Sequence, residues 1–237
     1  MIGVAHGAVM LNETAIAAVL GALICLDRVV VQFMVSRPVV AGPLIGLALG
    51  DPLTGLATGA LLELLWVDRI PVGTYVPPND TLVAILATSG AILAAPASGP
   101  PPRELIALAI LVFAPAGFLG QQLEMLLRKW NDGLVLQAAE DAKAGNAAGV
   151  TRRHLAALGR YLAGCLVFLF AALTCGTWLI RGIYPDLSGA VLRSLDFACT
   201  ILPLIGIGVA LNTIKLRGYI PVFCGVFLLL AIVAGFI

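Results

Sequence analysis

Charged residues are scarce in this chain. They make up 11% of its 237 residues, whereas an average soluble domain has about 25%. The 14 basic and 13 acidic residues are too few to cover the surface of a soluble protein of this size. Their near balance, a net charge of +1, produces no field that attracts DNA or RNA. Because 60% of the residues are hydrophobic, we predict a helical integral membrane protein with no nucleic-acid partner.

Motifs of catalysis and of metal binding are missing as well. The five cysteines form no CxxC pair, and the two histidines, His6 and His154, are far apart in the sequence. The stretch Gly50–Gly55 lacks the lysine of a phosphate-binding loop. The N-terminus has neither the basic region nor the cleavage site of a signal peptide, so we expect the first span to be retained. We therefore predict no catalytic residue, no metal site and no cofactor.

Five apolar stretches are long enough to cross a membrane core, which takes about 20 residues. They are Ala8–Leu26, Glu104–Leu127, Leu155–Ile180, Ser194–Ile214 and Ile220–Ile237. Three further apolar pieces lie between Arg37 and Ser98: Pro38–Gly50, Thr54–Val67 and Thr81–Ala97. The chain is thus predicted to be all-α and polytopic, a single transmembrane domain over residues 1–237 with about six to eight hydrophobic segments.

The region 38–97 differs from the other apolar stretches because glycine and proline interrupt it. A helix of about 14 residues covers about 21 Å, which is too short to cross the core. Such short or re-entrant helices point to the binding site of a transporter. Glu63, inside this region, is costly to expose to lipid, and Asn79 and Asp80 follow a Pro-Pro break. We expect these side chains to face a cavity or a partner. Asp51 is expected to cap a turn.

Residues 128–154 form the one long polar stretch of the sequence. Its basic residues outnumber its acidic ones, which places it in the cytoplasm by the positive-inside rule. The basic turn Lys215–Arg217 is expected on the same side, with 96–103 and 182–192 on the opposite side. The periodicity of this cytoplasmic loop leaves two interpretations open: a partly helical arm on a membrane or partner, or a solvated connector.

Several short motifs follow one another in the broken region. They are Arg37-Pro38, Gly50-Asp51, Thr54-Gly55, the spacing from Gly59 to Glu63, Pro71-Val72-Gly73 and Pro77-Pro78-Asn79-Asp80. Their order and spacing resemble the membrane subunit IIC of the mannose/fructose/sorbose-type sugar phosphotransferase system (PTS). Weaker similarity continues at Gly120-Gln121 and from Arg217 to Pro221. The family commonly has an acid directly after the last proline, whereas this sequence has Asn79 there and Asp80 next.

The resemblance implies a transport subunit of the inner membrane, without a phosphorylated residue of its own. Such a subunit pairs with a second membrane subunit, IID, and oligomerises. It passes a hexose or an amino sugar, which phospho-IIB phosphorylates with phosphate relayed through IIA. A sugar needs hydrogen-bonding groups in a dry pocket. Our candidates for them are Glu63, Asn79 and Asp80, followed by Thr74, Tyr75 and Gln121.

Three alternatives stay open at this point. Glu63 can instead form a structural ion pair with Arg37 or Arg69. Intramembrane acids such as Glu63 and Asp80 also suit an ion-coupled secondary transporter. The basic loop suits a non-transporting scaffold or sensor for soluble phosphotransfer proteins.

Overall fold

The computed structural model describes residues 2–69, 75–96, 99–214 and 218–233, and in these ranges every regular element is a helix. The helices are α1 (Ile2–Leu26), α2 (Pro38–Ala48), α3 (Pro52–Leu65), α4 (Asp80–Ala94), α5 (Arg103–Lys143), α6 (Ala147–Ile183), the 3₁₀ turn η1 (Tyr184–Asp186), α7 (Gly189–Ile214) and α8 (Tyr219–Val233). The predicted all-α fold and its number of apolar segments are therefore confirmed.

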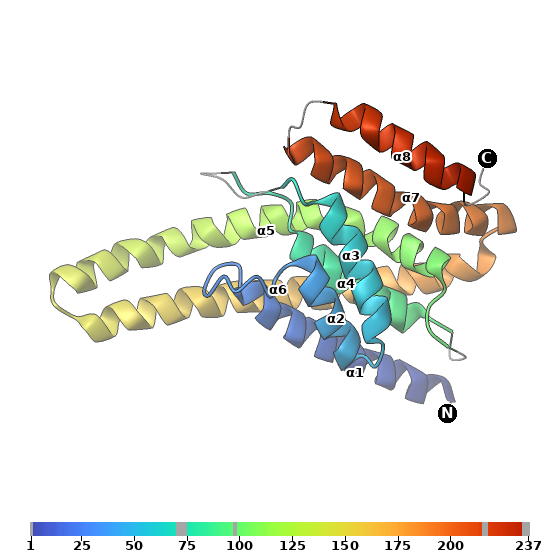
Figure 1. Ribbon diagram of the computed structural model, residues 1–237. Coiled ribbons are helices and arrows are strands. Elements are labelled where there is room, and N and C mark those ends of the chain that lie inside the picture. Colours follow the sequence, from blue (N-terminus) through green and yellow to red (C-terminus); the bar gives the residue numbers. More distant parts are fainter. Residues whose placement is uncertain (1, 70–74, 97–98, 215–217, 234–237) are drawn as a thin grey trace.

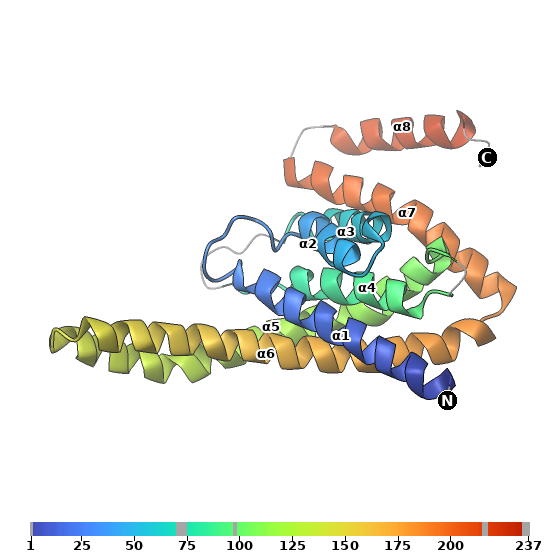
Figure 2. The same cartoon turned by 90° about the horizontal axis from the view of Figure 1, so that it is seen from below.

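Helix α4 lies at the centre of the molecule. Apart from residues at its two ends, it is buried along almost its whole length among α1, α2, α3, α5 and α6. Figure 1 shows α7 and α8 along one edge of this bundle, and α5 and α6 projecting from it as a long hairpin. Figure 2 shows the hairpin extending well beyond every other helix. The side from which the hairpin projects holds the ends of α1, α3 and α7. It also holds the starts of α2, α4 and α8.

The short helices α2 and α3 pack with their backbones almost in contact. A Cβ atom built on Gly42 would lie 2.3 Å from the carbonyl oxygen of Gly55, and one on Gly55 equally close to that of Gly42. At Gly59 the carbonyl of Pro38 would be 2.2 Å away. Only glycine permits this approach. Small residues bring membrane helices close together in the same way, so the two short helices form one compact pair.

Helices α5, α6 and α7 are long and apolar enough to cross a membrane. The predicted first span, Ala8–Leu26, lies within α1, which has 25 residues. The predicted last span corresponds to α8, whose described residues are Tyr219–Val233. Part of the predicted last span, residues 234–237, lies outside the described residues. The helices of the broken region are short, as expected.

The stretch 128–154, predicted as a loop, is helical except for a turn at residues 144–146. Local capping explains this structure. Gly145 adopts a φ of 69°, and the side chain of Asn146 accepts a hydrogen bond from the amide of Gly149 at 3.0 Å. Arg153 forms an ion pair with Asp141 across the hairpin at 3.4 Å. The stretch is thus helical, as its periodicity predicted. Its place in the cytoplasm and any contact with a membrane or a partner stay predictions.

Candidate functional site

Glu63 joins the two helices of the glycine-packed pair. It lies near the end of α3 and forms an ion pair with Arg37, the residue directly before α2. Its second oxygen accepts a hydrogen bond of 3.4 Å from the amide of Val39. This arrangement is the one that the structural interpretation of Glu63 predicts, with Arg37 rather than Arg69 as the partner. The role of Glu63 in binding a sugar remains a prediction.

At the other end of the pair, Asp51 caps α3, as predicted. Its side chain accepts hydrogen bonds from the amide of Thr54 at 3.0 Å and from the Thr54 hydroxyl at 2.6 Å. Pro52 follows as the first residue of the helix, where a missing N–H costs nothing.

Asn79 and Asp80 lie where α4 begins. The side chain of Asn79 is buried and caps the helix by accepting a hydrogen bond of 3.1 Å from the amide of Leu82. The amide of Asn79 donates to the carbonyl of Gly117 on α5 at 2.9 Å. Asp80 forms an ion pair with Arg28, which directly follows Asp27 at the end of α1. The start of α4 is thus held by one contact to α5 and by one to Arg28, which follows α1.

Arg28 connects Asp80 to the loop 27–37. It also donates to the hydroxyl of Thr81 at 3.1 Å, and that hydroxyl donates to the carbonyl of Ser36 at 2.7 Å. Asp27 holds the same loop, because its carboxylate accepts from the amides of Phe33 at 2.7 Å and Ser36 at 3.1 Å and from the Ser36 hydroxyl. Burial opposes the ionisation of Asp27, but these hydrogen bonds outweigh it and hold its pKa below the ordinary carboxylate value.

Gln121 lies on α5, one turn beyond Gly117. Its side-chain amide donates to the carbonyl of Val76, in the segment that leads to Asn79. Tyr75 is exposed, with 47% of its surface accessible. Thr74, the remaining predicted residue, lies outside the described residues. The structure therefore brings Asn79, Asp80 and Gln121 to one junction of α4 and α5, whereas the polar contacts of Glu63 are with α2.

Three polar residues near this junction were missed in the sequence. One is Arg28, the partner of Asp80. Glu124 and Tyr161 lie on facing helices, α5 and α6, and are 5% and 6% exposed. Glu124 forms an ion pair of 2.6 Å with Arg128. It stands inside a predicted apolar span, and an acid in that position is a signal that sequence reading can use.

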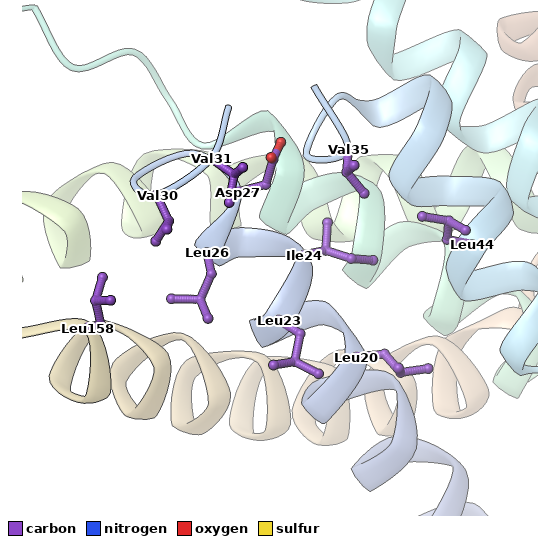
Figure 3. A pocket seen from close by; sticks show the side chains of 10 residues that line it. All are labelled: Leu20, Leu23, Ile24, Leu26, Asp27, Val30, Val31, Val35, Leu44 and Leu158. Carbon is purple, nitrogen blue, oxygen red and sulfur yellow. The ribbon is translucent and has the colours of Figure 1, made fainter. Parts of the chain in front are cut away.

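Two pockets lined by described residues lie elsewhere. One of about 520 Å³ is bounded by α1, the loop 27–37, α2 and α6. Figure 3 shows Leu26 of α1 on the side of Leu158 of α6, whereas the carboxylate of Asp27 points away from both. The lining is otherwise aliphatic and contains none of the predicted site residues. A second pocket, of about 890 Å³, lies at the opposite end of the bundle and includes Glu13, Asp51 and Arg181.

Comparison with known proteins identifies relatives of this chain. Residues 11–236 match the EII-Sor family, described as the PTS system sorbose-specific IIC component. The chain is 26% identical over 216 residues to the fructose permease IIC component of Bacillus subtilis (strain 168), covering 91% of this chain and 76% of the relative. It is 23% identical over 193 residues to the PTS system mannose-specific EIIC component of Escherichia coli (strain K12), covering 81% and 70%.

The fold also matches a solved structure. A chain in the cryo-EM structure of the mannose transporter ManYZ in complex with microcin E492 superposes with a TM-score of 0.62 and 21% sequence identity. The match covers 93% of this chain and 86% of that one. The similarity shows that the arrangement of helices is shared.

Proposed function

The chain belongs to the family of sorbose-specific IIC components of the sugar phosphotransferase system, and on this premise we propose that it passes a hexose or an amino sugar across the membrane. It is a PTS IIC sugar permease component of the mannose/sorbose family and a multi-pass protein of the inner membrane. In our proposal phospho-IIB phosphorylates the sugar, IIA relays the phosphate, IID is the membrane partner, and this chain is not itself phosphorylated.

One observation carries the proposal for the site. Polar side chains that are costly in a membrane protein gather where α4 begins, at a break between helices. Asp80, Asn79 and Gln121 supply acceptors and a donor there, the combination that sugar hydroxyls require. Discontinuous helices of this kind form the substrate sites of many transporters.

The charges at this region support a neutral substrate. Asp80 is paired with Arg28, and Glu63 is paired with Arg37. A bound Na⁺ would have to compete with a guanidinium group at either acid, whereas a sugar leaves both pairs electrically balanced. This argument favours sugar binding over ion coupling.

The test is binding of labelled hexoses to the chain co-expressed with its IID partner. We expect Glu63→Gln and Asp80→Asn to weaken binding about tenfold or more, because each removes a charged acceptor. Asp68→Asn is the matched control, since Asp68 is exposed and is bonded only to the neighbouring Arg69 among the described contacts. If Glu63→Gln and Asp80→Asn both bind like the wild type, the site assignment is wrong.

The coupling is tested with the same complex in vesicles. We expect accumulation of sugar phosphate to require phospho-IIB on the cytoplasmic side. Uptake that proceeds without phospho-IIB but requires an ion gradient would contradict the proposal and favour a secondary transporter.

A further inference from the structure

The pocket of about 890 Å³ at the end of the bundle opposite the hairpin is not explained by the site where α4 begins. Its lining comes from α1, α3, α6, the turn between α2 and α3, and the end of α4 with the segment that follows it. Sites for small molecules are usually cavities of about 300–1,000 Å³ with mostly apolar walls and a few polar groups. This pocket, which we call the Glu13 pocket, has that size and that composition.

Three half-buried charged side chains line the Glu13 pocket: Glu13, Asp51 and Arg181. Arg181 is held in place at the end of α4. Its Nε donates to the carbonyl of Leu93 at 3.2 Å, and its Nη2 donates to the same carbonyl. These bonds use only part of the donor capacity of a guanidinium group, so Arg181 presents further N–H groups in a fixed position.

The two acids supply free acceptors in the same pocket. Within the described part of the chain, Glu13 forms neither a hydrogen bond nor an ion pair. Each carboxylate oxygen of Asp51 accepts one hydrogen bond from Thr54, which leaves lone pairs on both. No ion pair joins either acid to Arg181 among these residues. Donors and acceptors therefore share one cavity without neutralising each other.

This combination selects the chemistry of a ligand. A metal cation is opposed by the guanidinium of Arg181, and an anion is opposed by the carboxylates of Glu13 and Asp51. A lipid chain would leave all three charges without a polar partner. The hydroxyl groups of a neutral sugar donate to carboxylates and accept from a guanidinium. Its C–H groups can pack against aliphatic wall residues such as Leu53 and Ile92.

We propose that the Glu13 pocket is a second binding site for the transported sugar, in which Glu13 accepts from its hydroxyl groups and Arg181 donates to them. This inference rests on the proposed function and deepens it. In the predicted orientation the pocket lies at the non-cytoplasmic end, where the sugar arrives. Helix α4 then has a sugar site at each end, one beside Asp80 and one beside Leu93 (Figure 1).

Occupancy of the pocket can be measured directly through Gly99. This residue lines the pocket, is exposed, and has no atom within 4 Å of the position that a Cβ would take. The variant Gly99→Cys is made after replacement of the exposed Cys175 and Cys224. Its labelling by a maleimide is followed in the detergent-solubilised complex with IID, with and without mannose, fructose, sorbose or N-acetylgalactosamine.

We expect a bound sugar to shield this cysteine. A sugar at ten times its Kd leaves about one pocket in eleven empty, so labelling of Gly99→Cys should slow about tenfold. Ser188→Cys is the matched control, because Ser188 is exposed at the same end of the bundle but does not line the pocket. Its labelling should proceed at the same rate with and without sugar.

The roles of the two charged residues are tested in the same assay. We expect Glu13→Gln and Arg181→Gln to raise the sugar concentration for half-maximal protection about tenfold or more, because each removes a charged hydrogen-bonding partner. Asp186→Asn and Arg193→Gln are the controls, since both residues are exposed and lie outside the pocket. Glu13→Gln breaks no described contact, so it remains decisive even if Arg181→Gln loosens the end of α4.

The possible failures are distinguishable. If the complex binds a labelled sugar but that sugar does not slow labelling of Gly99→Cys, the pocket is not a sugar site; the inference is then wrong and the proposed function survives. Protection that Asp80→Asn weakens and Glu13→Gln does not would arise from the site at the start of α4, and would also overturn the inference. A wild-type complex that binds none of these sugars would overturn both.

Discussion

A single carboxylate, that of Asp27, shapes the loop that carries Arg28 and Arg37. Within this loop Gln32 and Met34 have φ values of 57° and 65°, a region that residues other than glycine rarely adopt. Such conformations persist only where the surrounding contacts enforce them. The three hydrogen bonds that Asp27 accepts from Phe33 and Ser36 provide that enforcement.

We therefore predict that Asp27→Ala lowers the free energy of unfolding by about 1–3 kcal/mol, because three hydrogen bonds to its charged carboxylate are lost. Thermal unfolding of the purified protein in detergent measures the effect. Asp68→Ala, at an exposed position, should leave the melting temperature unchanged. An equal loss of stability in both variants would contradict the role of Asp27.

The stabilisation of the folded protein by Asp27 depends on pH in a defined direction. The pKa of Asp27 is lower in the folded protein than its ordinary value, so the stabilisation is complete above that ordinary value of about 3.9. It is lost as the pH falls through the lower, folded-state pKa. The difference in stability between wild type and Asp27→Ala should thus stay constant from pH 8 to pH 5 and shrink only below about pH 4. A difference that already shrinks between pH 8 and pH 5 would refute the assignment.

Some polar residues of the candidate site can be recognised from the sequence, and others cannot. Glu63 and Asp80 stand out because an acid in an apolar stretch is costly. The partner of Asp80 does not stand out, because Arg28 and Asp80 are separated by 52 positions and meet only through the packing of α1 against α4. Glu124 also lies inside a predicted span, but near its end, where an acid is a weaker signal than at the centre.

Among the elements, the α2–α3 pair depends most directly on its glycines. We predict that Gly42→Ala and Gly55→Ala each lower the stability by about 1–3 kcal/mol, since the added methyl group would overlap a backbone carbonyl that cannot turn aside. Unfolding by heat or denaturant in detergent is the measurement.

Gly159→Ala is the control for these two substitutions. Gly159 is also in a helix, α6, but no atom lies within 4 Å of the position that a Cβ would take. This variant should be as stable as the wild type or gain up to about 1 kcal/mol of helix propensity. A similar loss in all three variants would show that contact between α2 and α3 is not the cause.

The boundaries of the short helices were predictable because local chemistry sets them. Pro38 and Pro52 begin α2 and α3, and Asp51 and Asn79 cap α3 and α4. The continuation of α5 to Lys143 was less evident, since polar residues from Arg128 onward end the apolar pattern without ending the helix. An amphipathic partner helix stabilises such a segment, and hydropathy alone does not reveal that partner.

For the whole molecule, the length of the hairpin determines how it can lie in a membrane. Helix α5 has 41 residues, which corresponds to about 61 Å. The hydrocarbon core of a bilayer is about 30 Å thick, so a large part of the hairpin projects from it. The basic residues near its tip predict that this part lies in the cytoplasm.

The orientation is tested by cysteine labelling after replacement of the exposed Cys175 and Cys224. We predict that Ala144→Cys, in the turn of the hairpin, reacts with a membrane-impermeant maleimide in inside-out vesicles but not in intact spheroplasts. Ser188→Cys, at the opposite end of α6, should show the reverse pattern. Exchange of the two patterns would show that the orientation is inverted.

The contact between α2 and α3 has a mechanical consequence. Since no side chain separates the two backbones at Gly42, Gly55 and Gly59, no rotamer change can absorb a displacement between them. The Arg37–Glu63 ion pair ties one end of the two helices, and the tight turn at Asp51 ties the other. Any conformational change that reaches this region must therefore move α2 and α3 together as one rigid unit. A displacement of this unit at Arg37 also displaces Asp51, which lines the pocket at the opposite end of the bundle.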